Sequence, residues 1–166
     1  MAPSPKSSMP PVGAADARLL LLGSLPGDAS LAAQRYYAHP TNQFWRLLGG
    51  ALGEEWATID YEARLVRLAA RGVGLWDVVG QAERSGSLDG AIRSAVHNPL
   101  ADYAASHPRL EAVAFNGQTA ARLGRRAIGP TATALIDLPS SSAAFTAAFD
   151  AKLAQWRRLA AFLDPA

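Results

Sequence analysis

Four short apolar runs alternate with segments of helical spacing along the chain, and this alternation is the strongest constraint on its fold. The runs are Arg18–Leu22, Val73–Val79, Leu110–Phe115 and Ala132–Leu138, and each is followed by glycine, proline, asparagine or serine. Strands that alternate with helices in this way are typical of a mainly parallel sheet. We therefore predict an α/β protein, a three-layer sandwich with a central, mainly parallel four-stranded sheet flanked by helices.

The segments between and after these runs carry apolar residues at helical spacing. They are residues 43–52, 56–71, 118–126 and 145–163. Residues 80–89 are polar and contain two glycines, which predicts a loop. Residues 1–17 have one lysine and no continuous apolar stretch, so we predict a disordered tail there, followed by a single domain over residues 18–166.

The composition of the 166 residues argues against several classes of protein. No apolar run reaches the ~18–20 residues that a membrane-spanning helix needs. Cysteine is absent, so no disulfide or thiolate metal site can form, and the three histidines are scattered. The formal net charge of +2 does not by itself establish a nucleic-acid partner. We expect a cytoplasmic protein that uses neither a metal nor a cofactor.

Ligands of parallel α/β sheets bind beyond the carboxyl ends of the strands. The richest segment at such a position is residues 23–45, which contain two adjacent tyrosines, a His-Pro, a lone asparagine and a Phe-Trp pair. The chain has no P-loop, dinucleotide-binding fingerprint or serine-hydrolase elbow. Aromatic, amide and hydroxyl groups with few carboxylates suit a flat heterocycle, held by stacking and by hydrogen bonds to its edge.

Five motifs at these strand ends resemble the uracil-DNA glycosylase superfamily, and most closely its hypoxanthine-DNA (deoxyinosine) glycosylase branch. They are GSLPGDAS, YYAHPTNQFW, GLWDVV, VAFNGQTA and LPSSSAAF, and the resemblance runs from about Arg18 to Leu163. It implies a monofunctional DNA glycosylase of base excision repair, which flips a deaminated base from DNA and hydrolyses its N-glycosidic bond. Hypoxanthine is the first expected base and uracil the second. The implied partner is double-stranded DNA that contains a damaged base, and we expect a monomer.

The resemblance also assigns roles to individual residues. Asn42 would be the catalytic amide, which holds the attacking water or hydrogen-bonds the departing base; alternatively it caps the helix that follows. Phe44 would stack under the flipped base, unless it is a core residue. Asp77 stands where uracil-specific relatives carry the amide that reads the base edge, and would otherwise cap a loop.

Further residues are expected around the base and along the DNA backbone. Ser24 and Tyr37 would line the base pocket. The residues expected to contact the DNA backbone are Gly23, Pro26, Gly27, Ser30, His39, Ser140, Ser141 and Ser142.

The sequence departs from the superfamily pattern at three points. Leu25 stands where relatives usually carry a water-orienting Asp or Asn, and Leu138 where they carry a His that stabilises the base anion. Ala143 and Ala144 fall where relatives place the residue that fills the vacated stack. Two alternatives stay open. One is a uracil or mismatch-specific uracil/thymine glycosylase, because both bases present a similar amide edge, although Leu25 and Leu138 argue against a strong uracil enzyme. The other is a non-catalytic nucleic-acid-binding module on the same fold, which Leu25 and Leu138 favour.

Overall fold

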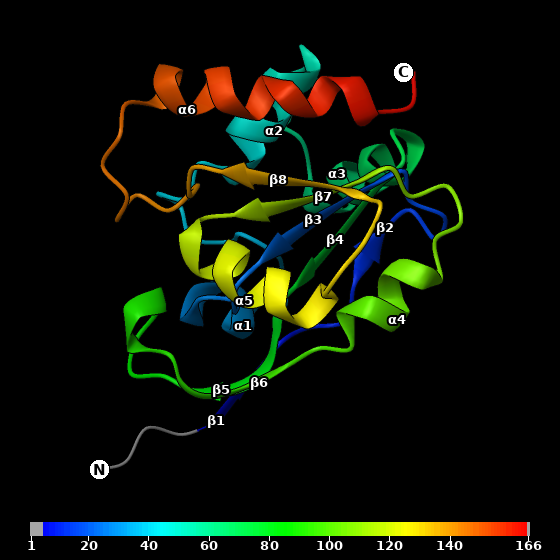
Figure 1. Ribbon diagram of the computed structural model, residues 1–166. Coiled ribbons are helices and arrows are strands. Elements are labelled where there is room, and N and C mark those ends of the chain that lie inside the picture. The colour runs from blue at the N-terminus through cyan, green and yellow to red at the C-terminus, as the bar shows by residue number, and fades with distance from the viewer. Residues whose placement is uncertain (1–4, 166) are drawn as a thin grey trace.

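The structure, a computed structural model, describes residues 5–165 (Figure 1). Its central sheet has five strands in the order β2-β4-β3-β7-β8. The strands are β2 (Val12–Gly13), β3 (Leu19–Gly23), β4 (Val73–Asp77), β7 (Ala112–Asn116) and β8 (Ala134–Leu138). β4, β3, β7 and β8 are parallel, and β2 adds a short antiparallel edge strand. The predicted sandwich around four parallel strands is confirmed.

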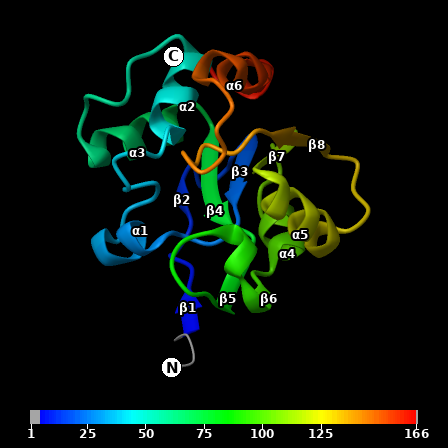
Figure 2. The same ribbon diagram turned by 90° about the vertical axis from the view of Figure 1, so that its left-hand side faces the viewer.

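The leucines of β3 alternate between the two faces of the sheet. Leu19 and Leu21 belong to one apolar cluster, and Leu20 and Leu22 to the other. The helices on the first face are α2 (Phe44–Leu52), α3 (Tyr61–Ala70) and α6 (Phe149–Trp156), and those on the second are α4 (Leu100–Ala105) and α5 (Gln118–Ile128). Figure 2 shows these two layers on either side of the sheet. A continuous apolar strand fits this position because both of its faces are covered.

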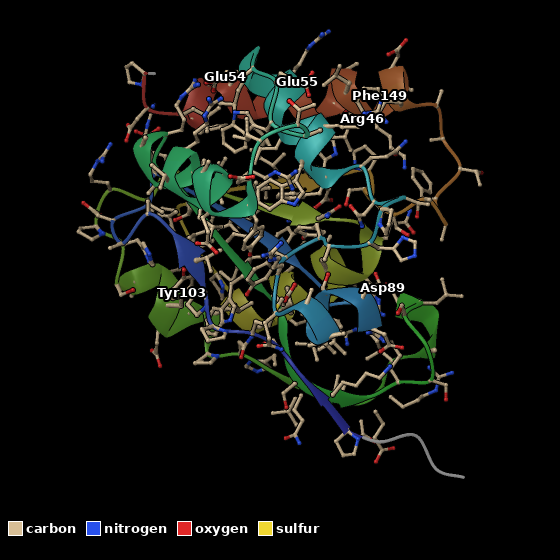
Figure 3. All side chains as sticks on the ribbon, turned by 180° about the vertical axis from the view of Figure 1, so that it is seen from behind. Arg46, Glu54, Glu55, Asp89, Tyr103 and Phe149 are labelled. Carbon is tan, nitrogen blue, oxygen red and sulfur yellow. The ribbon has the colours of Figure 1, made fainter. Side chains whose placement is uncertain are left out.

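Two predicted helices are shorter than their sequence pattern. α3 begins at Tyr61, after Asp60 in extended conformation, rather than at Trp56. The closing helix begins at Phe149 and passes at Arg157 into the 3-10 helix η2 (Arg157–Phe162). α6 packs along α2, where the guanidinium of Arg46 lies 4.3 Å from the ring centre of Phe149 (Figure 3).

A second, antiparallel sheet stands at one end of the molecule and was not predicted. Its strands are β1 (Pro5–Ser7), β5 (Val79–Glu83) and β6 (Arg93–His97), in the order β1-β5-β6. The predicted loop at residues 80–89 is therefore partly a strand. The connection from β5 to β6, which contains the 3-10 turn η1 (Asp89–Ala91), returns toward α1 (Asp28–Ala33). This hairpin brings residues 87–89 next to the carboxyl end of β3.

The prediction of a disordered tail is wrong for the described part of residues 1–17. Met9 is buried in the core, and its carbonyl oxygen accepts hydrogen bonds from Trp76 Nε1 (2.9 Å) and the Tyr36 hydroxyl (3.2 Å). Together with β1 and β2, these contacts fix the segment against β4 and β5. Residues 1–4 lie outside the described residues. Over residues 5–165, no helix is both long and apolar enough to cross a membrane.

Candidate functional site

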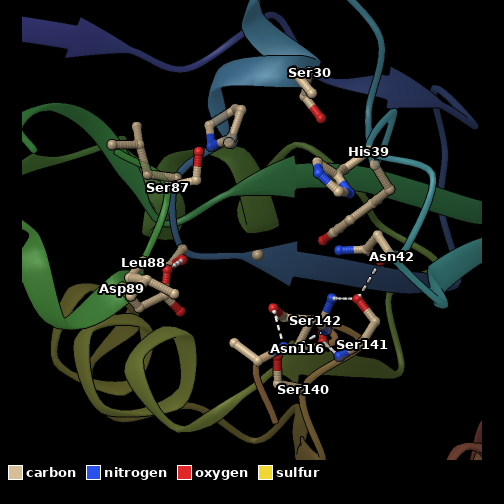
Figure 4. A pocket seen from close by; sticks show the side chains of 18 of the residues that line it. Ser30, His39, Asn42, Ser87, Leu88, Asp89, Asn116, Ser140, Ser141 and Ser142 are labelled. Atoms are coloured by element: carbon tan, nitrogen blue, oxygen red, sulfur yellow. Dashed lines mark hydrogen bonds between the residues drawn. The ribbon is translucent and has the colours of Figure 1, made fainter. Parts of the chain in front are cut away.

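A cavity of about 300 Å³ opens at the carboxyl ends of the four parallel strands (Figure 4). Gly23, Asp77 and Asn116, the last residues of β3, β4 and β7, line it together with Ser140 after β8. The chain places β4 on one side of β3 and β7 on the other, so the cavity lies at the point where the strand order reverses. This is the usual binding position of an open α/β sheet.

All but one of the predicted site residues line this cavity. They are Gly23, Ser24, Pro26, Gly27, Ser30, Tyr37, His39, Asn42, Asp77, Ser140, Ser141 and Ser142. The exception is Phe44, whose side chain is fully buried behind the cavity wall.

The amide of Asn42 is oriented by two donors. Its Oδ1 accepts hydrogen bonds from the Phe44 backbone N–H (2.9 Å) and from the Ser141 hydroxyl (2.8 Å). Because the backbone N–H can only donate, the oxygen must face these groups, and the Nδ2 donor faces the cavity, as Figure 4 shows. The helix-capping contact is therefore present, and it leaves the amide hydrogens of Asn42 free for a ligand.

Ser141 connects Asn42 to the end of β7. Asn116 Nδ2 donates to the Ser141 hydroxyl (2.9 Å), and the Ser141 N–H donates to Asn116 Oδ1 (2.9 Å). The Ser141 hydroxyl is therefore buried and doubly hydrogen-bonded, which corrects the expectation that it binds a DNA phosphate. The neighbouring hydroxyls of Ser140 and Ser142 accept bonds from nearby backbone N–H groups, so their own hydrogens stay available to donate.

Helix α6 holds the loop that carries these serines. The buried Lys152 donates from Nζ to Gln43 Oε1 (2.9 Å) and to the Ser142 carbonyl (3.1 Å). Trp156 Nε1 donates to the carbonyl of Pro139 (3.0 Å). The beginning of α2 and the loop after β8 are thus fixed to the same helix.

Tyr37 takes the position at the cavity wall that the sequence assigns to Phe44. The two rings stack at 3.9 Å between centroids, with 10° between their planes. Phe44 also contacts Trp45 and Trp156 edge to face, so it belongs to the aromatic core. The exposed stacking surface in the cavity is the ring of Tyr37. Its hydroxyl is buried and makes no hydrogen bond of normal geometry to any described residue.

Asp77 is a carboxyl group in an unusual environment. Its side chain is 3% exposed, and Oδ2 has no hydrogen-bond partner among the described residues. Burial, and after it the nearby charge of Asp89, raises the pKa of Asp77 to about 7, and Arg84 only partly opposes this. A neutral carboxyl group donates one hydrogen bond and accepts another, whereas the ionised form only accepts.

Asp89 is the second carboxyl group of the cavity, and it comes from the β5–β6 connection. It accepts a short hydrogen bond from the Ser24 hydroxyl. Burial raises the pKa of Asp89, while the Ser24 hydrogen bond and then Arg84 favour its charged form. The sequence pattern did not single out Asp89, because its contact with Ser24 spans 65 positions and follows no local periodicity.

Ser30 and His39 shape the loop between α1 and α2. The buried Ser30 hydroxyl accepts a hydrogen bond from the Ala38 N–H (3.0 Å), which ties α1 to the loop that follows it. His39 Nδ1 accepts from the Thr41 N–H (3.1 Å), which leaves Nε2 on the exposed side of the ring as a donor. Of these two residues, His39 is the better placed to meet a phosphate.

A second groove adjoins the cavity along α2 and α3. It shares Tyr36, Tyr37, His39 and Asn42 with the cavity, and its cationic side chains are Arg35, Arg46 and Arg64. In the part of the chain that the structure describes, no three histidine, aspartate or glutamate side chains gather as a metal site. The site is therefore a pocket of amides, hydroxyls and two carboxyl groups beside a groove with positive charge.

Residues 10–163 match the Uracil DNA glycosylase superfamily. The chain belongs to this superfamily. It is 42% identical over 113 residues to a Hypoxanthine DNA glycosylase of Methanosarcina barkeri, a match that covers 68% of this chain and 72% of that protein. It is 39% identical over 115 residues to a Hypoxanthine DNA glycosylase of Methanosarcina acetivorans, with coverage of 69% and 73%. The resemblance inferred from the five motifs is confirmed.

The superfamily assignment extends to the three-dimensional structure. A solution NMR structure of a candidate uracil DNA glycosylase from Methanosarcina acetivorans superposes with a TM-score of 0.82. It is 34% identical to this chain, and the match covers 94% of this chain and 96% of the other. The similarity to this structure therefore extends over nearly the whole length of both chains.

Proposed function

We propose that the protein is a DNA glycosylase that binds a flipped hypoxanthine in the cavity and hydrolyses its N-glycosidic bond. The superfamily and the two relatives named Hypoxanthine DNA glycosylase support the reaction class. The observation that carries the proposal is the presence in one pocket of the Asn42 Nδ2 donor and of the buried Asp77, whose Oδ2 has no hydrogen-bond partner among the described residues. Removal of a base from DNA requires such an enclosed, polar pocket, because the base must leave the stack to react.

Asp77 in its neutral form matches the edge of hypoxanthine. Its carbonyl oxygen accepts the N1–H of the base, and its hydroxyl donates to O6. The neutral form also removes the repulsion that a carboxylate would exert on the departing base anion. Uracil presents the same donor and acceptor pair at N3–H and O4, so it is the second candidate base.

Asn42 stabilises the departing base in this proposal. Both lone-pair directions of its Oδ1 are taken by Phe44 and Ser141, so only the Nδ2 donor remains for the reaction. The bond between C1′ and N9 breaks with its electron pair on the base, and water adds its hydroxyl to C1′ and its proton to the base. A fixed donor at the developing negative charge lowers the barrier to this step.

The adjoining groove binds the DNA backbone. Arg35, Arg46 and Arg64 bring positive charge to this groove. Contacts between arginine and phosphate supply most of the sequence-independent affinity for DNA, and they weaken as salt concentration rises.

The deciding experiment compares wild type with Asn42→Asp and Asn42→Ala. The assay measures single-turnover base release from duplexes that carry one hypoxanthine, one uracil or one G·T mismatch. Asn42→Asp keeps the acceptor for Phe44 and Ser141 but replaces the donor with a negatively charged oxygen, and Asn42→Ala removes the amide altogether. Both variants lack the donor, so we expect each to lose roughly 10²–10³-fold. Release from hypoxanthine duplexes at the wild-type rate by Asn42→Asp would contradict the mechanism, and release of no base by wild type would contradict the proposed function.

A further inference from the structure

One large apolar side chain, that of Leu88, lies exposed at the cavity. Among the described residues, those with substantial exposure are Val66, Leu88, Val96 and Phe145. Only Leu88, which is 63% exposed, lines the cavity. It belongs to none of the three apolar clusters that residues 5–165 form, so packing of the core does not account for its position.

The residues around Leu88 are firmly anchored. Arg84 donates from Nη2 to the Pro26 carbonyl and from Nη1 to the Leu25 carbonyl, and from Nε to the carbonyl of Gly86 (2.9 Å). On the two sides of Leu88, Ser87 Oγ accepts from the Asp28 N–H (2.9 Å), and Asp89 accepts from Ser24. The backbone of Leu88 is therefore held while its side chain remains free.

Leu88 lies across the cavity from Asn42 (Figure 4). A base that enters the cavity leaves a gap in the duplex, and unstacking costs a few kcal/mol per step. An apolar side chain that enters the stack offsets this cost. In the loop after β8, the apolar residues that line the cavity are Ala143 and Ala144, whose methyl groups are too small to fill such a gap.

Phe145, which follows Ala144 in the chain, is a larger exposed apolar side chain, but it already contacts Lys152. The Nζ of Lys152 lies 5.3 Å from its ring centre, and the ring is 46% exposed. Leu88 has no comparable contact and reaches the cavity itself. We propose that Leu88 is the wedge that fills the duplex when the base enters the cavity, an inference that rests on the proposed glycosylase function.

The test compares Leu88→Ala with Val96→Ala, a matched control on β6 of the same hairpin that is 62% exposed and outside the cavity. Base release by each variant is measured on two substrates. One is a fully paired duplex with hypoxanthine opposite cytosine, and the other carries the same hypoxanthine inside a bubble of unpaired nucleotides. The gap needs filling only in the paired duplex, so Leu88→Ala should be roughly 10- to 100-fold slower there and near wild type in the bubble. Val96→Ala should match wild type on both substrates.

The outcomes separate this role from the proposed function. Equal loss on both substrates, or no loss on either, overturns the role of Leu88. A loss confined to the paired duplex for Phe145→Ala but not for Leu88→Ala overturns it as well, because the wedge would then come from the loop after β8. If wild type releases no base from either substrate, the proposed function fails and the role of Leu88 fails with it.

Discussion

The ring of Tyr37 lies parallel to the ring of Phe44, with 3.9 Å between their centroids, and covers the face that Phe44 would otherwise present to the cavity. The backbone of Tyr37 has a φ of 54°, a value that non-glycine residues adopt uncommonly. This conformation directs the side chain into the pocket beside Gly23 and Asp77. Tyr37, and not Phe44, is therefore the residue of this stacked pair that lines the cavity.

Two substitutions at Tyr37 separate stacking from hydrogen bonding. Tyr37→Phe keeps the ring and removes a buried hydroxyl that has no hydrogen-bond partner among the described residues. We therefore expect hypoxanthine release near wild type and an unchanged or higher melting temperature. Tyr37→Ala removes the stacking surface, which is worth ~1–3 kcal/mol per base, so affinity for hypoxanthine-containing DNA should fall roughly 5- to 150-fold. Faster release by Tyr37→Ala would show instead that Tyr37 blocks the face of Phe44.

The raised pKa of Asp77 predicts a decline of activity at alkaline pH. If the neutral form of Asp77 binds the base, single-turnover release should fall as pH rises through about 7, where the group loses its proton. Above that value the rate should drop roughly tenfold per pH unit. The measurement is the pH profile of hypoxanthine release from 5.5 to 9, taken at about constant ionic strength.

Asp77→Asn is the matched control, because an amide donates and accepts at the same positions and does not titrate. Its profile should stay flat through pH 7. Folding takes up a proton at wild-type Asp77 between its ordinary pKa of 3.8 and its folded value of about 7. Stability should therefore fall across this interval as pH rises in wild type, and less so in Asp77→Asn.

Substitution of Asp89 should also change the pH profile of hypoxanthine release. Its charge helps to raise the pKa of Asp77, so Asp89→Asn should move the decline of activity to lower pH. Asparagine keeps an acceptor for the Ser24 hydroxyl, which preserves the loop. Glu83→Gln removes an exposed charge from the same hairpin and should leave the profile in place. Identical profiles for Asp89→Asn and wild type would show that the two carboxyl groups do not interact.

Much of the central sheet follows from sequence pattern because each of its parallel strands is short, apolar and ended by a turn-forming residue. The same rule identified the cavity edge, since residues at the carboxyl ends of neighbouring strands converge. The β5–β6 hairpin escaped prediction for the opposite reason. All five residues of β6 are exposed, so no alternation of polar and apolar side chains marks the strand.

The details of the site depend on contacts that sequence spacing does not contain. Asn116 appeared only as part of a turn after a strand, and its importance comes from a hydrogen bond to Ser141, 25 positions away. Phe44 was a reasonable stacking residue by motif, but tertiary packing placed Tyr37 over it. Leu88 and Asp89 gain their positions from Arg84, whose acceptors lie in the loop after β3.

The close packing around Gly23 leaves no room for even a single added methyl group. A Cβ at this position would lie 2.6 Å from Asp77 Oδ1 and 2.7 Å from the Tyr37 hydroxyl, closer than normal contacts allow. Gly23→Ala should therefore displace one of these side chains and reduce hypoxanthine release, and wild-type turnover by this variant would contradict the close packing. At Gly90, a Cβ would meet no heavy atom within 4 Å, so Gly90→Ala should leave release near wild type.

We expect the N-terminal segment to contribute measurably to the stability of the fold. Removal of residues 1–11 would delete β1 and the Met9 and Pro10 carbonyl oxygens, which accept hydrogen bonds from the Tyr36 hydroxyl. It would also leave Trp76 Nε1 without its acceptor. Each buried donor left unpaired costs about 1–3 kcal/mol, so the melting temperature should fall by several degrees. Removal of residues 1–4 alone keeps all of these contacts and is the matched control. Equal melting temperatures for the two truncations would contradict this expectation. The contacts of residues 5–11 with Tyr36 and Trp76 would then add nothing to the stability of the fold.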